Sequence, residues 1–247
     1  FRSMLLSNFL GNGVGGLAFP PRWGMVTPEE IERVDVMYGP FSAAYPGNSV
    51  GAVVEYTSRM PEKFEGSAKV GYSHQPFQLY STDATYGGWQ SSASLGSHAG
   101  DWSWRLNLSH SDTQSQPLTF ATRSVGSGTA GSLGTATRGA VPGLNSSNTP
   151  WLILGTGTQV HTVQDHAKAK LAYDLSPSVR ATYTLATWQN SAEGRSQSYL
   201  SDASGQAVTR GVFNVDGRSY AALTGGDFPL THESLTHTLH GLSIKRR

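Results

Sequence analysis

The sequence has no cysteine, which excludes a disulfide framework or a thiolate metal site. Charged residues make up only 14% of its 247 residues, against roughly 25% in an average soluble domain. The net charge of +1 gives no electrostatic footprint for nucleic acid. No apolar run approaches the roughly 18 residues of a membrane-spanning helix. A barrel strand needs only alternation over about 10 residues, so a membrane is not excluded.

Alternation of polar and apolar residues is what the chain does have. The segment 102–111, WSWRLNLSHS, places four apolar side chains on one face of a strand and the polar ones on the other. Segments 67–73, 167–175 and 179–185 alternate in the same way. Two tryptophans at one end of 102–111 are typical of the aromatic girdle at a membrane interface. A soluble sandwich also alternates, but its outward face carries more charge, so we favour a barrel.

The spacing of these segments predicts six strands separated by short turns and longer connections. Tight turns are expected at 99–101 and 175–178, and long loops at about 113–159 and 190–233. In outer-membrane barrels the short turns are periplasmic and the long loops are extracellular. The strands are expected at residues 65–75, 88–98, 102–112, 161–175, 179–189 and about 234–245, with a further loop between the first two.

The segment from Pro28 to Arg59 has a different character. Thr27 before a proline and two glutamates predicts a helix start of about one turn. Alternation at 34–36 then predicts a strand, turn residues fill 39–48, and a second strand is expected at 51–57. This is a compact unit without a catalytic constellation, and we expect no enzyme.

The order of residues in this segment carries a resemblance. Its most specific members are Ile31, Glu32, Arg33, Gly39, Pro40, Tyr45, Gly47 and Gly51. In this order the segment resembles the end of the plug domain of TonB-dependent outer-membrane receptors, whose pattern includes IER, GP and YG followed by a Gly-Val strand and Thr-Arg. The sequence departs from that pattern in having Tyr38 where most members carry Arg, and in an inserted Pro46.

The resemblance implies an all-β membrane β-barrel, of which about six antiparallel strands of a presumed 22 are present. The C-terminal part of a small α+β plug domain would precede it, with the plug at residues 1–60 and the barrel at 61–247. The chain begins FRSMLL without an initiator Met and stops at IKRR within a strand-like run, so we expect a fragment.

The family's function would then be energy-dependent, TonB-coupled uptake of a scarce nutrient, most often a ferric siderophore, across the outer membrane of a Gram-negative bacterium. The implied partners are outer-membrane lipid, an extracellular small-molecule ligand such as an iron chelate, and a TonB-type energy-transducing complex that acts through a segment upstream of Phe1. No cofactor is implied. Candidate ligand contacts are the aromatic residues Phe41, Tyr80, Tyr86, Phe120 and Trp151.

Charged residues of the plug are expected to pair with the barrel wall. Glu32 and Arg33 are the candidates on the plug side. Their expected partners in a polar lumen are Lys69, Arg105, Lys168, Lys170 and Arg180.

Other site interpretations are weaker. The spacing of Gly11, Gly13 and Gly16 fits a dinucleotide loop, but two prolines forbid the helix that must follow. His237 and His240 point to opposite faces of a strand, which disfavours a metal site. Two rival functions remain open: a secreted β-rich protein that binds or cleaves glycans, and a passive porin or adhesin barrel.

Overall fold

The computed structural model describes residues 2–5, 25–38 and 52–246. These residues form several sheets, almost entirely antiparallel, and two short 3-10 helices, with no α-helix among them. Within the described residues, no helix is long and apolar enough to cross a membrane. The protein is therefore a mostly β structure, as the sequence predicts.

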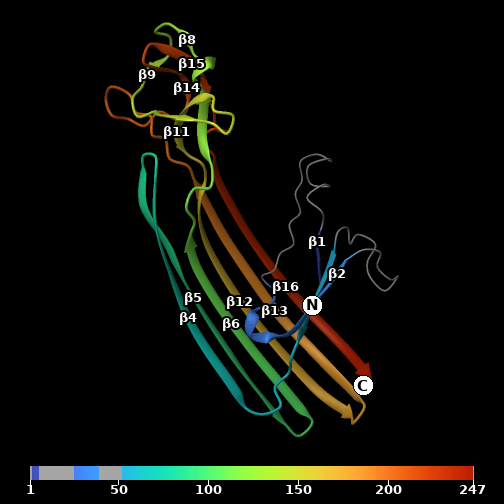
Figure 1. The fold of residues 1–247 in the computed structure, drawn as a ribbon. Coiled ribbons are helices and arrows are strands. Elements are labelled where there is room, and N and C mark those ends of the chain that lie inside the picture. Colours follow the sequence, from blue (N-terminus) through green and yellow to red (C-terminus); the bar gives the residue numbers. More distant parts are fainter. Residues whose placement is uncertain (1, 6–24, 39–51, 247) are drawn as a thin grey trace.

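A six-stranded antiparallel sheet, the main sheet, forms the body of the molecule (Figure 1). Its spatial order is β16-β13-β12-β6-β5-β4, so each of its strands pairs with the next main-sheet strand along the chain, also across the two long connections. Its strands are β4 (Glu65–Leu79), β5 (Thr82–Ala99), β6 (Trp102–Gln114), β12 (Gln159–Ser176), β13 (Val179–Arg195) and β16 (Leu230–Arg246). The sheet is open along β4 and β16, and no closed barrel is present in the described part of the chain.

All six predicted strands are found, and each extends further than expected. The loop expected between residues 75 and 88 is wrong, because β4 and β5 continue to a two-residue turn at Tyr80 and Ser81. Tyr80 adopts a left-handed φ of 54° there. Alternation is hard to read in this stretch because Gly87 and Gly88 have no side chains. A Cβ on Gly88 would lie 2.5 Å from the Asp112 carbonyl oxygen, so the sheet needs glycine there.

The two faces of the main sheet differ in polarity as 102–111 predicts. Arg105 is only 3% exposed on the inner face, whereas its neighbours Trp104 and Leu106 are each 37% exposed on the outer face. Ser103 and Asn107 are also buried on the inner face. The usual arrangement of a soluble protein is thus inverted: the polar side chains are covered and the apolar ones are exposed.

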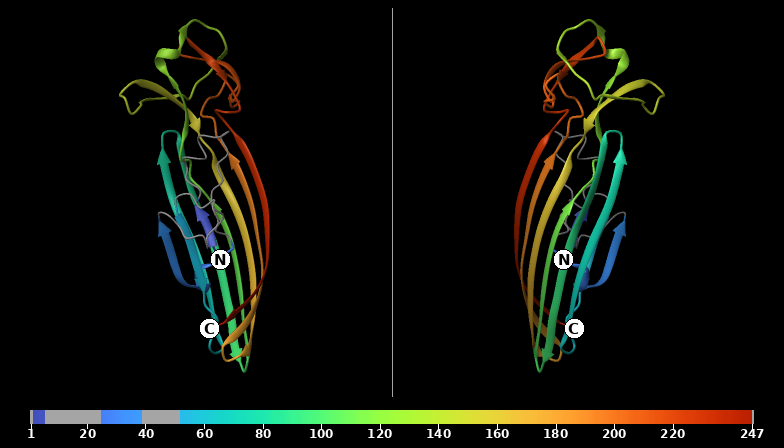
Figure 2. Two further views of the ribbon diagram at one scale, coloured as in Figure 1. Left: turned by 90° about the vertical axis from the view of Figure 1, so that its right-hand side faces the viewer. Right: turned by 90° about the vertical axis from the view of Figure 1, so that its left-hand side faces the viewer.

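A small sheet, the N-terminal unit, lies against the inner face (Figures 1 and 2). It consists of β1 (Arg2–Leu5), the 3-10 helix η1 (Pro28–Glu30), β2 (Ile31–Tyr38) and β3 (Ala52–Ser58), with spatial order β1-β3-β2. The short helical start and the two strands that follow were predicted. The strand at residues 2–5 was not, because it forms only by pairing with β3, fifty residues later.

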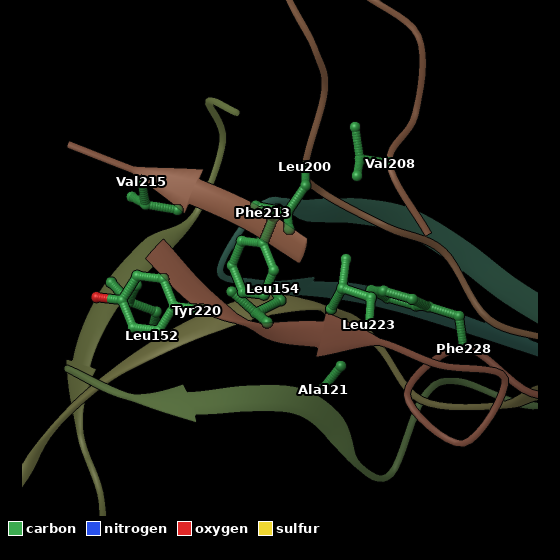
Figure 3. Close-up of a cluster of buried hydrophobic side chains, with 10 residues drawn as sticks. All are labelled: Ala121, Leu152, Leu154, Leu200, Val208, Phe213, Val215, Tyr220, Leu223 and Phe228. Carbon is green, nitrogen blue, oxygen red and sulfur yellow. The ribbon is translucent and has the colours of Figure 1, made fainter. Parts of the chain in front are cut away.

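The two long connections fold together into a cap at one end of the main sheet (Figures 1 and 2). Its elements are β7 (Phe120–Ser124), η2 (Val125–Ser127), β8 (Thr129–Ala130), β9 (Thr135–Ala136), β10 (Val141–Leu144), β11 (Pro150–Thr156), β14 (Gly211–Val215) and β15 (Arg218–Leu223). Figure 3 shows its apolar core, in which Leu154 from the first connection meets Phe213 and Leu200 from the second.

A bidentate ion pair joins the two connections beside this core. Arg123 on β7 donates to both carboxylate oxygens of Asp227, at 2.6 and 3.0 Å. The hydrogen bond from Arg123 lowers the pKa of Asp227 most, and the Thr224 N–H adds to it, so that the pKa stays below its ordinary value although burial opposes the shift. Two loops that are 104 residues apart at this point are thereby held as one body.

The cap core gives a first prediction. Phe213 is fully buried and stacks on Tyr220 with a centroid distance of 5.2 Å. Phe213→Ala should destabilise the cap by about 3–5 kcal/mol. Limited proteolysis should then cut 115–158 and 196–229 much faster while the main sheet stays intact. Leu133→Ala, at an exposed cap position, is the control and should change nothing; equal cleavage of the two variants would contradict a shared core.

The ion pair gives a pH prediction. Because the pKa of Asp227 is lowered by folding, its stabilisation is present above the unfolded pKa of about 3.9 and is lost as pH falls through the folded value. Asp227→Asn should therefore weaken the cap at pH 7, by about 1.5–3 kcal/mol for a charge-assisted pair. The difference from the wild type should shrink below about pH 4. A difference that is constant with pH in hydrogen exchange of the cap would contradict this role.

Candidate functional site

Four cations on the inner face of the main sheet point toward the N-terminal unit. They lie on three strands: Lys69 on β4, Arg105 on β6, and Lys168 and Lys170 on β12. Successive side chains of a strand point to opposite faces, and these four occupy positions that point to the same face of the sheet. Each of them contacts the N-terminal unit.

The partner of these cations is chiefly the first turn of the N-terminal unit. Thr27 precedes Pro28, whose fixed φ suits a helix start. The Thr27 N–H donates to the Glu30 carboxylate at 2.9 Å, which folds that side chain back over the turn. The Arg59 N–H donates to the Glu30 carbonyl oxygen at 3.1 Å, which ties the turn to the end of β3. The turn is therefore fixed at both ends before it meets the sheet.

Lys168 and Glu30 form a buried ion pair between the two units. The Lys168 Nζ lies 2.8 Å from the Glu30 carboxylate, and the side chains are 4% and 0% exposed. Lys168 also donates to the Met25 carbonyl oxygen at 3.1 Å. A buried pair of this kind adds little net stability over an apolar contact, but losing one partner leaves a buried charge without compensation. The pair therefore fixes where the turn must sit.

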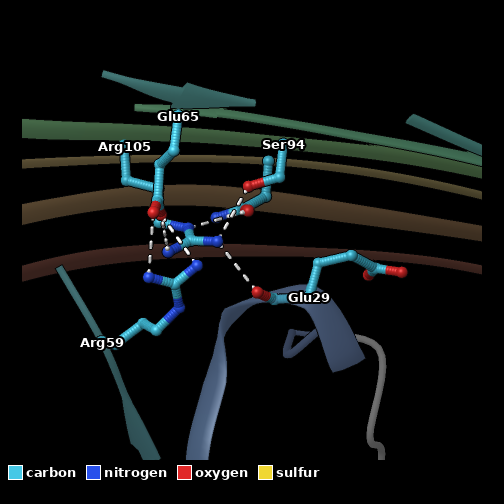
Figure 4. A network of polar contacts seen from close by, with 6 residues as sticks. Glu29, Arg59, Glu65, Ser94 and Arg105 are labelled. Carbon is cyan, nitrogen blue, oxygen red and sulfur yellow. Dashed lines mark hydrogen bonds and ion pairs between the residues drawn. The ribbon is translucent and has the colours of Figure 1, made fainter. Parts of the chain in front are cut away.

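Arg105 forms the second contact and binds a main-chain group (Figure 4). Its guanidinium donates to the Glu29 carbonyl oxygen at 2.8 Å and to the Ser94 hydroxyl at 3.0 Å. Glu65 balances its charge at 3.3 Å and also pairs with Arg59 at 2.8 Å. One arginine thus links three strands of the sheet to the N-terminal unit.

Glu29 and Ser58 complete the polar contact. The Glu29 carboxylate lies 3.2 Å from the Lys69 Nζ and accepts a hydrogen bond from Ser92 at 3.0 Å. Burial by itself would raise the pKa of Glu29, but these contacts and its own backbone N–H together hold the pKa below its ordinary value. Lys170 donates to the Ser58 hydroxyl at 2.7 Å.

A small apolar contact lies beside the polar one. Met25 packs with Ala186 and Trp188 of β13, and Leu235 and Leu239 of β16 flank the cluster. These residues lie on the inner face of the sheet, which is otherwise polar near the turn. The N-terminal unit is therefore held by ion pairs on one side and by one apolar side chain on the other.

The wall residues of this site match the sequence prediction, but their partners differ. Four of the five expected wall residues contact the N-terminal unit, whereas Arg180 pairs with Asp174 inside its own hairpin. On the other side, Arg33 pairs with Asp35 of its own strand, and Glu32 is exposed. The start of β2 is exposed at Glu32, Arg33 and Val34, and the helical turn before β2 meets the wall instead. The acidic pair after Thr27 was the signal for this role.

The predicted motif residues are only partly described. Ile31 starts β2 and pairs with Ser58. Six predicted residues lie outside the described part of the chain. They are the motif residues Gly39, Pro40, Tyr45, Gly47 and Gly51 and the predicted ligand contact Phe41.

Three of the predicted ligand-contact residues lie at the base of the cap. Tyr80 at the β4–β5 turn meets Phe120 edge to face with a centroid distance of 4.9 Å. Tyr86 is buried nearby and donates to Gln159 at 2.7 Å. Tyr199 joins them through a hydrogen bond to Thr82 and was missed, because its loop carries no alternation. Trp151 lies apart from them, on β11 within the cap.

No group of histidine and acidic side chains in the described residues could hold a metal ion. His237 packs on Trp188 on the inner face, and His240 contacts Tyr183 on the outer face, so the two point apart as expected.

No protein-family model, curated protein or solved structure matches this chain. The resemblance of residues 28–59 to a plug domain therefore stays a prediction.

The buried pair gives a third prediction. Lys168→Met leaves Glu30 buried without its cation and should cost about 3–5 kcal/mol in the docking of the N-terminal unit. Glu30→Gln should cost a similar amount, and the double variant should cost less than the sum of the two. These costs form a double-mutant cycle, which can be measured from the proteolytic protection of residues 25–38 in the intact protein.

Arg33→Met is the matched control, because it removes a cation of the exposed pair on β2. It should change protection by no more than about 0.5 kcal/mol. If Arg33→Met is as costly as Lys168→Met, the anchoring function belongs to β2 and not to the turn.

Proposed function

We propose that this chain is part of a TonB-dependent outer-membrane receptor, with the N-terminal unit as the end of its plug and the main sheet as part of its barrel wall. The observation that carries the proposal is the inverted polarity of the main sheet. Arg105 is covered while Trp104 and Leu106 are exposed, which suits a polar lumen and a lipid-facing exterior.

The middle of the outer face on β6, β12 and β13 has the composition that lipid requires. Leu106 pairs with Ala169, and Ala169 with Leu185, which gives an uncharged row across three strands. Below this row, Trp102 packs on Tyr173 with a centroid distance of 4.6 Å, as in an interfacial aromatic girdle. Apolar area of this extent exposed to water would be a liability in a soluble protein.

The height of the apolar part of the outer face also suits a lipid bilayer. The first polar pairs above the row are His110 with Asp165 and His161 with Asp112, each at 2.7 Å. From Trp102 to His110, the first polar position, a strand rises about 27 Å at about 3.4 Å per residue. A tilt of about 40° reduces this to about 21 Å, which is comparable with the apolar band of roughly 25 Å in such barrels.

The contacts of the N-terminal unit suit a plug that must move. Its polar anchors are a few ion pairs and hydrogen bonds to Lys69, Arg105, Lys168 and Lys170, and its apolar contact is the small cluster around Met25. By the resemblance, an energy-transducing complex pulls on a segment upstream of Phe1. The ligand, a ferric siderophore in our proposal, binds outside the cell, where the aromatic group at the base of the cap is the candidate contact. Transport then requires that ligand and energy favour different states of the plug.

The rival functions predict different behaviour. A secreted glycan-binding or glycan-cleaving protein partitions into water, whereas we expect the intact protein to partition into detergent. A passive porin takes up solute without the energy-transducing complex. We expect uptake of a ferric siderophore by cells that carry the protein only when that complex is present. Uptake that persists without the complex would exclude the receptor.

A substitution on the outer face tests the lipid contact directly. Leu106→Arg lies in the middle of the apolar band and should cost about 2–4 kcal/mol of folding into lipid vesicles. Leu118→Arg, on an exposed side chain between β6 and β7, is the control and should have no effect. In a water-facing sheet Leu106→Arg would stay within about 0.5 kcal/mol of the parent, and that result would overturn the proposal.

A further inference from the structure

The four wall cations Lys69, Arg105, Lys168 and Lys170 form one group on the inner face, here named the cation strip. Arg105 and Lys170 lie directly opposite each other on the paired strands β6 and β12. Lys168 lies two residues from Lys170 and therefore on the same face. Like charges directly opposite each other on adjacent strands destabilise a sheet, so this arrangement needs anions close by.

The main sheet supplies one anion to the cation strip. Glu65 on β4 lies 3.3 Å from Arg105, and within the described residues it is the only sheet carboxylate in ion-pair contact with the strip. Glu65 is shared with a further cation, Arg59 (Figure 4). Lys170 donates to the Ser58 hydroxyl, which carries no charge. The strip therefore has more positive charge than the carboxylates of its own sheet balance.

The other anions of the strip belong to the N-terminal unit. Glu30 lies 2.8 Å from Lys168, and Glu29 lies 3.2 Å from Lys69. These two carboxylates are adjacent in sequence, so the two lysines converge on η1 although β12 and β4 are separated by β6 and β5. If the N-terminal unit moves away, both lysines lose the only carboxylates that contact them in the described part of the chain. Their ammonium groups are then free to bind another anion.

The groups that fill the strip in the docked state indicate the chemistry of its ligand. Carboxylate oxygens accept strong, charge-assisted hydrogen bonds from lysine and arginine. A neutral molecule in their place would leave the positive charges uncompensated, and a cation would be repelled. A molecule with two or more carboxylates restores the balance that Glu29 and Glu30 provide.

We propose that the cation strip is an exchange site for polycarboxylates. Glu29 and Glu30 occupy it while the N-terminal unit is docked, and a solute with several carboxylates occupies it once the unit is displaced. The geometry of the site stands on the described residues alone, whereas the identity of this solute with the transported chelate rests on the proposed function. In that case the ligand is an iron chelate with free carboxylates and not a neutral or cationic one.

Binding of citrate, a tricarboxylate, to the intact protein in detergent tests the site, measured by calorimetry at fixed ionic strength. Glu29→Gln combined with Glu30→Gln removes the two internal competitors and should tighten citrate binding about tenfold or more relative to the wild type. Adding Lys168→Met to this glutamine pair should weaken binding again by about tenfold. If the two glutamates served only to hold η1 in place, these substitutions would not change citrate binding.

The matched control neutralises two carboxylates outside the strip. Glu62→Gln combined with Glu193→Gln makes the same change in net charge at two exposed positions. It should leave citrate binding at the level of the wild type. An equal gain in this control would show that binding follows net charge.

The wild-type protein gives a second readout that needs no substitution. Citrate at ten times the Kd of the glutamine pair should speed proteolysis of residues 25–38, because a ligand that binds only the undocked state shifts the equilibrium toward it. Acetate at the same ionic strength should not, since a single carboxylate cannot contact two cations of the strip in place of both glutamates.

Four outcomes would overturn the site: no gain in citrate binding by the glutamine pair, an equal gain in the control, proteolysis that citrate leaves unchanged, or tighter binding of pyrophosphate than of citrate. The last would make the ligand a phosphate. Failure of energy-dependent uptake with citrate exchange intact would remove the receptor function and leave the site standing. Energy-dependent uptake without citrate exchange would do the reverse.

Discussion

The ion pair between Lys168 and Glu30 is the interaction on which the rest of the arrangement depends. A lysine on the inner face of the sheet is covered by the N-terminal unit, so it needs a carboxylate at hydrogen-bond distance. This requirement fixes the position of the helical turn at Glu30. The same turn presents the Glu29 carbonyl oxygen to Arg105. The polar inner face is therefore not filled at random. Near the turn it is matched group by group to η1, Met25 and Ser58, and the apolar band of the outer face is left for another medium.

The sequence was most informative where one physical rule dominates. The period of two in 102–111 predicts the strand, its faces and the burial of Arg105, because a strand has no other way to place alternate side chains. The helical start after Thr27 was equally readable, since Pro28 and the two glutamates leave few alternatives. The residues of the wall that hold the N-terminal unit follow from the same alternation.

Prediction failed where structure depends on distant pairing. The strand at residues 2–5 has no pattern of its own and forms on the edge of β3. The cap strands are short, some of only two residues, and their core draws Leu154 and Phe213 from connections that each look like a polar loop. The choice of Glu29 and Glu30 over Glu32 and Arg33 as anchors depends on how the turn docks, which local sequence does not record.

The cap has a mechanical consequence for the sheet. The first connection of the cap links β6 to β12, and the second links β13 to β16. The Arg123–Asp227 pair and the Phe213 core join these two connections, so they tie together four strands of the sheet, from β6 to β16. At the opposite end only tight turns link neighbouring strands. The cap thus acts as a brace that fixes the splay of four strands at one rim and leaves the other rim free to flex. A load applied to the N-terminal unit would deform the sheet first at the unbraced rim.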